Sequence, residues 1–303
     1  MAEWLQKDYS ISTLTWIGLP LTEALNRLTA SGWRHIEIMV EDGHRELLDW
    51  SETQRTELER WSREEGISWS VHAPIHGVNA CASDPETIEA GLATLKQAIG
   101  IAHRLDAAYV VLHPGEYKRA IPDVATDPDG YAAARADCLS LCALFLRRLI
   151  NETGGEAGIP LALENVPPRP DRFGSDCGFL LEAIAAAGTS RVRILLDAGH
   201  AHLCGPGRAI AELRKCKPLL IGMHIGDNHG ERDEHLAVGS GTVPYRELAA
   251  ELGEDGERLI WVLETGNEAA AAASLNPLEA WRAPHRAARG DSLPEHEPGG
   301  GGA

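Results

Sequence analysis

Eight short apolar runs, placed between Ile11 and Glu264 and separated by longer amphipathic stretches, most strongly limit how this chain can fold. Several of them are rich in Val, Ile and Leu on both faces, which is typical of strands covered by helices. The predicted strands are Ile11–Thr15, His35–Met39, Ser68–His72, Tyr109–His113, Pro160–Glu164, Arg193–Asp197, Ile221–Ile225 and Ile260–Glu264.

The segments between these strands have the marks of helices. One has apolar residues at helical spacing from Leu21 to Leu28, with Gly32 as a stop signal. Another has Asp84 as a candidate N-cap and Pro85 at its first helical position. The predicted helices are Leu21–Ala30, Pro85–Leu105, Tyr131–Ile150, Gly178–Ala187 and Glu268–Arg282, the last one interrupted by Pro277.

Eight strands alternating with helices predict a parallel sheet with crossover helices, and eight strands close a (β/α)8 barrel of about 250 residues. We therefore expect an α/β fold, a single-domain TIM barrel over residues 1–283. The alternative is an open doubly wound sheet, which usually carries a glycine-rich phosphate turn after its first strand; Thr15–Gly18 is not such a turn. Residues 284–303 are rich in Pro, Gly and charge, so we expect a disordered tail there.

Charge and cysteine content limit the class of protein. Acidic residues outnumber basic ones by 45 to 28, and the formal net charge of −17 disfavours a general binder of nucleic-acid phosphates. The N-terminus has no basic segment followed by an apolar stretch, and no run approaches the roughly 18 apolar residues of a membrane span. The six cysteines form no CxxC pair and fit buried free thiols. We expect a cytoplasmic protein with no membrane partner.

Six of the predicted strands deliver a metal-binding residue type at their carboxyl ends. In a barrel these ends meet at one mouth, where barrel enzymes keep their active sites. Carboxylates and imidazoles gathered there would repel or stay unpaired without a cation, at a cost of several kcal/mol. We therefore expect a divalent metal: the mixed N and O ligands suit Zn²⁺, Mn²⁺, Co²⁺ or Fe²⁺, leave Mg²⁺ open and suit Ca²⁺ less well. The six residues are His72, His113, Glu164, Asp197, His224 and Glu264.

Other polar residues near the strand ends are ambiguous. His200 lies three residues after Asp197 and could be a ligand or support one. Asp233 and His235 lie in a charged loop, where such a pair is more often a solvated turn. Glu37, in the second strand, fits a ligand, a substrate contact or a structural role.

Three larger side chains are candidate substrate contacts. Trp16, at the end of the first strand, could form a wall of the pocket. Arg169 and Arg232 lie in loops on the mouth side and could hold an anionic group, although exposed arginines with no specific role are more common.

Six segments around these residues resemble the xylose isomerase-like TIM-barrel superfamily, which includes sugar isomerases and epimerases as well as the endonuclease IV family of apurinic-site nucleases. The resemblance runs from about Ser10 to Ala280 and is specific for the superfamily rather than for the reaction. The segments are VHAP, VVLHPGE, LALEN, LLDAGHAH, GMHIGDNHGERDEHLAVGSGTVPY and VLETGN.

The resemblance implies a set of site residues. In the isomerases and epimerases, the metal ligands match Glu164, Asp197, His224 and Glu264, and the two glutamates correspond to the acid/base pair that acts on opposite faces of the substrate. In endonuclease IV, a trinuclear zinc site uses those positions and several more. This chain has a matching residue at each, so the ligand set leaves both activities open. The additional positions match His72, His113, His200, Asp233 and His235.

The loops after the early strands favour a small substrate. Val40–Glu46 is net acidic and Trp16–Pro20 is apolar, so neither is suited to approach DNA phosphates. We therefore predict a metal-dependent isomerase or epimerase of a sugar, sugar phosphate or related polyol, acting by enediolate-type proton transfer, with Trp16 and Arg232 as substrate contacts and no nucleic-acid partner.

Two other functions stay open at this point. One is an endonuclease IV-like apurinic-site phosphodiesterase with a trinuclear zinc site, and the other is a barrel that binds a ligand without chemistry. A homodimer is compatible with the fold, but the sequence does not require one.

Overall fold

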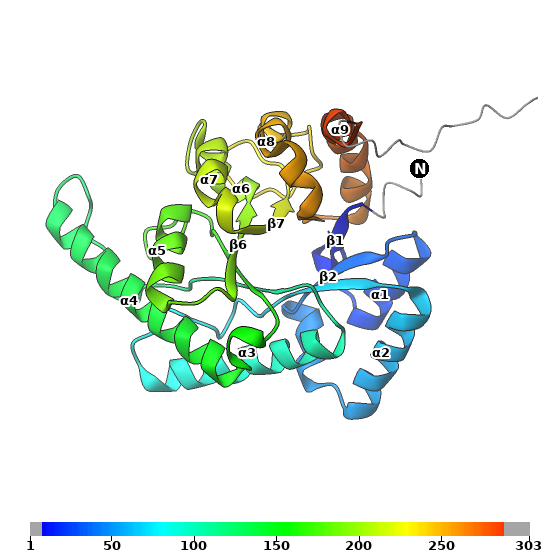
Figure 1. Cartoon of the computed structure of the whole chain (residues 1–303), viewed down its shortest axis with the longest axis horizontal. Helices are drawn as coiled ribbons and strands as arrows, with labels where there is room; N and C mark the ends of the chain where they lie inside the picture. The colour runs from blue at the N-terminus through cyan, green and yellow to red at the C-terminus, as the bar shows by residue number, and fades with distance from the viewer. Residues whose placement is uncertain (1–7, 288–303) are drawn as a thin grey trace, which may run out of the picture.

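The computed structural model describes residues 8–287 and confirms the predicted (β/α)8 barrel. Eight parallel strands close in sequence order, and β1 pairs with both β2 and β8. Figure 1 shows the helices arranged around these strands. The strands are β1 (Ser10–Ser12), β2 (His35–Met39), β3 (Ser68–His72), β4 (Val110–Leu112), β5 (Leu161–Glu164), β6 (Val192–Asp197), β7 (Leu220–Ile225) and β8 (Ile260–Leu263).

The connecting segments are mainly helical. The α-helices are α1 (Leu21–Ala30), α2 (Glu52–Glu65), α3 (Pro85–Arg104), α4 (Pro128–Glu152), α5 (Cys177–Ala187), α6 (Ala198–Leu203), α7 (Arg208–Cys216), α8 (Tyr245–Leu252) and α9 (Glu268–Ala287). Short 3-10 helices are η2 (Thr13–Trp16), η3 (Asp42–Asp49), η4 (Gly155–Ala157), η5 (Lys217–Leu219) and η6 (Gly253–Arg258). No helix in this described part of the chain is both long and apolar enough to cross a membrane.

The first strand is shorter than predicted, because Ser12 starts a turn. Its side chain accepts a hydrogen bond from the backbone N–H of Leu14 at 3.2 Å, and the Thr15 hydroxyl donates to the Ser12 carbonyl at 3.0 Å. Such side-chain bonds compete with strand pairing. The predicted strand residues Thr13–Thr15 therefore lie in η2, and Trp16 ends that turn.

Helix α2 is not among the predicted helices, although the residues at its two ends carry clear helix signals. Ser51 and Gln54 form a capping box at its start, and Gly66 ends it with a φ of 65°. Its polar composition hides the apolar periodicity on which helix prediction depends, because only Leu58 and Ser62 are buried.

Helix α9 continues through Pro277, so the predicted interruption there is wrong. A proline inside a helix costs about 3 kcal/mol, but Leu275 and Leu278 are fully buried on either side of it. Burying two leucines contributes about as much as the proline costs. The first four residues of the predicted tail at 284–303 belong to this helix, and the rest of the tail lies outside the described residues.

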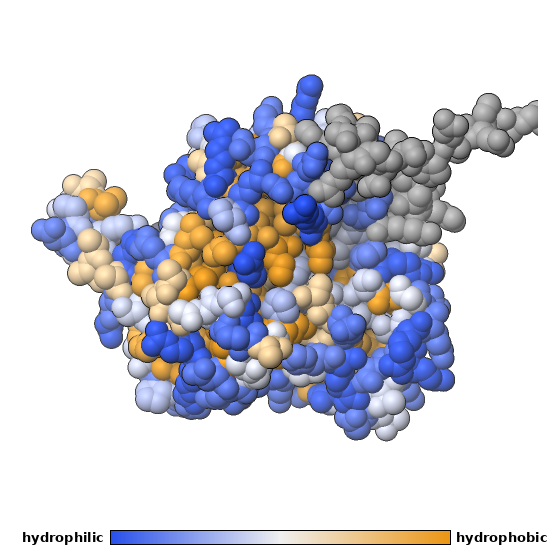
Figure 2. Space-filling view, viewed as in Figure 1, coloured by the Kyte–Doolittle hydropathy of each residue, from blue (hydrophilic) through white to orange (hydrophobic). Residues whose placement is uncertain are grey.

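Apolar side chains pack on both the inner and the outer side of the strands. Tyr109, Val111, Ala162 and Leu195 are fully buried and form a small core inside the barrel. Alternate strand residues such as Val110 belong instead to the large core under the helices. In Figure 2 hydrophobic residues gather in the middle of the face shown, and the outer helices are mainly hydrophilic. The six cysteines are free, and all but the half-buried Cys204 are buried, as predicted.

A glycine in β7 makes room for the inner core, which gives a test of the packing. A Cβ on Gly222 would lie 2.8 Å from the Tyr109 hydroxyl oxygen and 3.1 Å from the backbone oxygen of Ile260. Overpacking of this kind costs about 1–3 kcal/mol. We expect Gly222→Ala to lower the free energy of unfolding by that amount in urea denaturation. Gly18→Ala, which meets nothing within 4 Å, is the control; equal stabilities of the two variants would contradict this packing.

Candidate metal centre

A cavity of about 550 Å³ opens where the strands end. Its lining includes His72, His113, Glu164 and Glu264, which come from the carboxyl ends of β3, β4, β5 and β8. This is the end at which barrel enzymes place their active sites, and the volume is typical of small-molecule sites.

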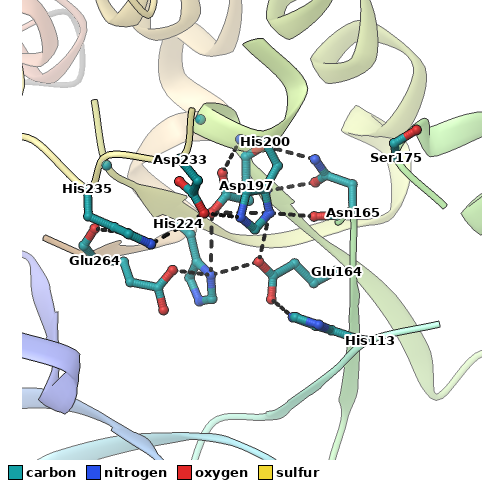
Figure 3. A network of polar contacts seen from close by, with 12 residues as sticks. His113, Glu164, Asn165, Ser175, Asp197, His200, His224, Asp233, His235 and Glu264 are labelled. Atoms are coloured by element: carbon teal, nitrogen blue, oxygen red, sulfur yellow. Dashed lines mark hydrogen bonds and ion pairs between the residues drawn. The ribbon is translucent and has the colours of Figure 1, made fainter. Parts of the chain in front are cut away.

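Four of the predicted ligands form one compact group. Glu164, Asp197, His224 and Glu264 each offer a ligand atom, and these four atoms lie within 4.8 Å of one another. All four side chains are buried, and Figure 3 shows them converging. Strand register produces this meeting, because Asp197 pairs directly with His224 in the neighbouring strand.

The Nδ1 atom of His224 faces three carboxylates. It lies 3.1 Å from Glu164 Oε1, 3.4 Å from Glu264 Oε2 and 3.9 Å from Asp197 Oδ2. Burial by itself would lower the pKa of His224, but the negative charges around it raise that pKa well above its usual value. The surroundings of this nitrogen therefore favour positive charge.

The donor set fits a divalent cation. Oε1 of Glu264 is buried and has no hydrogen-bond partner among residues 8–287, and an unpartnered buried carboxylate oxygen is costly. Three carboxylates and one imidazole are a ligand set that Mn²⁺, Zn²⁺ and Co²⁺ accept. A cation at this point would satisfy the free oxygen and offset the repulsion among the carboxylates.

Glu37 orients His224 from the other side. Its Oε1 lies 2.8 Å from His224 Nε2, and its Oε2 accepts a hydrogen bond from the Ser70 hydroxyl at 2.8 Å. A carboxylate at Nε2 holds a hydrogen there and leaves Nδ1 facing the other ligands. Of the three roles that the sequence left open for Glu37, the structure shows this supporting contact.

Asn165 fixes the end of β6. Its side chain accepts a hydrogen bond from the Asp197 N–H at 2.8 Å and donates to the Asp197 carbonyl at 2.9 Å. The Asp197 carboxylate in turn accepts from the His200 N–H and caps α6. Burial raises the pKa of Asp197 to about 7, and the nearby Glu164 carboxylate adds to that rise while His200 opposes it.

His72 and His113 both contact the second oxygen of Glu164. Their Nε2 atoms lie 3.2 Å and 3.0 Å from Glu164 Oε2, and these three residues form a second group able to hold a metal. Burial lowers the pKa of His113. Burial would also lower the pKa of His72, but the hydrogen bond to Glu164 and the surrounding carboxylates raise it.

The Asp-x-His pair in the loop after β7 reaches the site. Asp233 Oδ2 lies 3.0 Å from His200 Nε2 and 3.3 Å from His235 Nε2, and Figure 3 shows this contact group beside His224. Against the effect of burial, neighbouring carboxylates raise the pKa of His200 to about 10 and that of His235 to about 9. This pair is therefore part of the cavity wall rather than a solvated turn.

Asp227, which was not among the predicted site residues, holds that loop in place. It is buried, and its carboxylate accepts hydrogen bonds from the N–H groups of Gly239, Gly241 and Val243 at 2.8–3.0 Å. Its backbone also forms a bridge with Leu236. Local sequence patterns give no signal for this role, because the N–H groups that Asp227 binds lie 12 to 16 residues further along the chain.

Trp16 and Arg232 do not line the cavity. The Trp16 ring lies under the Arg27 guanidinium at 4.7 Å, and its Nε1 donates to Glu268 at 2.9 Å. Arg232 is 80% exposed and lies 3.5 Å from Glu234. Their predicted contact with substrate stays a prediction, while Arg169 does line the cavity.

Comparisons with known proteins agree with the barrel fold. The sequence profile of the xylose isomerase-like TIM-barrel family matches residues 25–288. An uncharacterised protein of Methanocaldococcus jannaschii is 24% identical over 275 residues, which cover 88% of this chain and 86% of that protein. A D-psicose 3-epimerase of Enterocloster bolteae is 22% identical over 200 residues, which cover 66% of this chain and 62% of that protein. The crystal structure of a D-tagatose 3-epimerase-like protein has a TM-score of 0.78 at 24% identity and covers 93% of this chain and 99% of its own.

Glu37 gives a test of the metal centre that leaves its four ligands in place. We expect Glu37→Gln to weaken Mn²⁺ or Zn²⁺ binding about 10- to 100-fold, because loss of such a supporting carboxylate misorients the ligating imidazole. Calorimetric titration measures the affinity, and Glu57→Gln on the exposed face of α2 is the control. Unchanged affinity in a folded Glu37→Gln protein would show that Glu37 does not support the site.

Proposed function

Since this chain belongs to the xylose isomerase-like TIM-barrel family, we propose that it is a metal-dependent epimerase that inverts a sugar carbon next to the carbonyl. One observation carries the proposal: Glu164 and Glu264 offer carboxylate oxygens to the same buried group as Asp197 and His224. The sugar 3-epimerases among its structural and sequence relatives support that reaction class. An isomerase acting on a sugar or related polyol would use the same proton transfer.

A divalent cation held by Glu164, Asp197, His224 and Glu264 would supply Lewis-acid polarisation of the substrate carbonyl and the neighbouring hydroxyl. The chain itself must then remove a proton from one face of the carbon and return one to the other. Glu264 suits one of these steps, because its Oε1 is buried and free of hydrogen bonds within residues 8–287. A carboxylate oxygen in that state can accept or deliver a proton.

Glu164 suits the other step. Burial would raise its pKa, but His224 and His113 lower it well below the usual value, so this carboxyl is held in the charged form. His72 and His113 also fix its orientation through Oε2. A charged, fixed carboxylate is the form that a general base needs. We therefore assign the proton transfers to Glu164 and Glu264.

The endonuclease IV-like activity is the second candidate, and a specific observation favours it. His72 and His113 complete a second possible metal group on Glu164, and beside the first group Asp233 contacts both His200 and His235. Such a site could hydrolyse a phosphodiester with several metal ions. The acidic Glu41 and Asp42 line one part of the cavity, however, whereas a DNA backbone needs cations along its whole path. Cleavage of an abasic duplex that chelator abolishes would favour this candidate.

Proton transfer can be followed directly in deuterated water. Metal-loaded protein incubated with neutral ketoses, sugar phosphates and sugar acids in turn should introduce deuterium into at least one of these classes, at the carbon next to the carbonyl, which NMR detects. We expect Glu264→Gln to slow the exchange by about 10²- to 10⁴-fold, the usual contribution of a general acid or base. Glu231→Gln, an exposed position on the same side of the barrel, is the matched control.

Two results would contradict the proposal. One is near-normal exchange in Glu264→Gln, which would remove this residue from the reaction. The other is the absence of exchange in the metal-loaded wild-type protein with neutral sugars, sugar phosphates and sugar acids alike.

A further inference from the structure

The side of the cavity formed by the loops after β4 and β5 carries positive charge that the proposed proton transfer does not use. Lys118, Arg169 and Arg172 line the cavity there, together with one carboxylate, Glu116. We call these four residues the basic wall. The chain as a whole has a net charge of −17 and repels anions. A group of cations on one side of its cavity therefore differs in charge from the rest of the chain and indicates a local role, such as binding an anion.

The basic wall is held in place by hydrogen bonds. Asn79 accepts a hydrogen bond from the Glu116 N–H and donates to the Glu116 carbonyl, both at 3.0 Å. The Glu116 carboxylate then pairs with Arg172 Nη2 at 3.0 Å and with Lys118. Arg172 Nε also lies 3.4 Å from Asp171 Oδ1, so two carboxylates balance the two paired cations, and the net positive charge of the wall comes from Arg169.

Arg169 is the unpaired cation of this wall. Its side chain is exposed and forms no ion pair or hydrogen bond with any residue in 8–287, whereas Arg172 is only 11% exposed and already bound. Pro167, Pro168 and Pro170 surround it in sequence. Since proline fixes φ, this loop presents Arg169 with little backbone freedom to lose on binding.

The depth of the cavity separates Arg169 from the reacting carboxylates. Glu164 and Glu264 are 1% and 4% exposed and form the floor, and Arg169 lies at the open side, five residues beyond Glu164. A guanidinium offers a fork of donors that matches phosphate and carboxylate groups. A substrate with its carbonyl at the floor would direct its other end towards this fork.

We propose that Arg169 binds an anionic group, a phosphate or a carboxylate, at the end of the substrate away from the carbonyl. The substrate class is then a sugar phosphate or a sugar acid rather than a neutral sugar. This proposal rests on the proposed function, because it names the substrate class of the same site. Arg172, Lys118 and Glu116 supply the fixed surroundings in which Arg169 acts.

Binding measurements test the substrate class without requiring turnover. Calorimetry on the metal-loaded protein would compare D-fructose, D-fructose 6-phosphate and D-glucuronate. We expect one or both anions to bind at least about tenfold more tightly than fructose, and Arg169→Gln to weaken that anion by about 10- to 100-fold, the effect of losing a charged hydrogen bond. The affinity for fructose should be the same in Arg169→Gln and in the wild type. Arg169→Lys should keep part of the preference for the anion over fructose, because it keeps the positive charge.

Arg246→Gln is the matched control, because Arg246 is an exposed arginine of α8 that lies outside the cavity lining. It should leave all three affinities unchanged. The proposal is overturned if wild type binds fructose as tightly as both anions, or if Arg169→Gln affects the three ligands equally or not at all. A preference for phosphate or for glucuronate identifies which anion is recognised.

Failure of this proposal can be told apart from failure of the proposed function. An anion preference that depends on Arg169, without deuterium exchange in any sugar, would leave the binding proposal standing and remove the epimerase. Deuterium exchange in neutral sugars without any preference for anions would leave the epimerase standing and remove the anion-binding proposal.

Discussion

Three buried carboxylates face one nitrogen of His224 at the open end of the barrel, and their mutual repulsion is the constraint around which the site is arranged. Taking each charge out of water costs several kcal/mol, which attraction within the site must offset. In the protein alone, the offset comes from protons, since the pKa of His224 is raised and the pKa of Asp197 moves to about 7. A divalent cation would replace those protons, which couples metal binding to their release.

The barrel is the means by which this unfavourable group is held together. Strand closure brings the ends of β5, β6, β7 and β8 to one place, and the inner and outer cores supply the stability that the site reduces. Three residues around the ligands hold them in place by hydrogen bonds. Glu37 fixes the His224 imidazole, Asn165 fixes the end of β6, and Asp227 fixes the loop after β7. The site is therefore set before any ligand arrives, a condition for precise metal and substrate positioning.

The floor and the mouth of the cavity have different chemistry, and the proposed substrate would contact both. The buried carboxylates at the floor suit proton transfer, while Arg169 at the mouth suits an anion. A substrate bound at both ends would be oriented in part by Arg169, which takes no part in the proton transfer, and such remote binding energy can position the reacting carbon.

Sequence patterns predicted most of the barrel and the ligand positions, for physical reasons. Strands β2 and β3 match their predicted bounds, since buried strands are short apolar runs, and Glu164 and Asp197 could be predicted because strand ends meet in a barrel. The roles of Glu37 and Asp227 could not, because they depend on which side chains face each other across strands and loops. The position of Trp16 outside the cavity lining could not be predicted either, because it depends on the turn that begins at Ser12.

The metal centre is tested most directly by the amount of metal bound per chain. Protein dialysed against excess Mn²⁺ and then against metal-free buffer would be measured by plasma mass spectrometry, with Asp197→Ala and His224→Ala as variants. We expect about one ion per wild-type chain and almost none in either variant, since each variant lacks a ligand of the group. If the wild type holds no metal, and takes up none with Zn²⁺ or Co²⁺, these four residues do not form a metal centre.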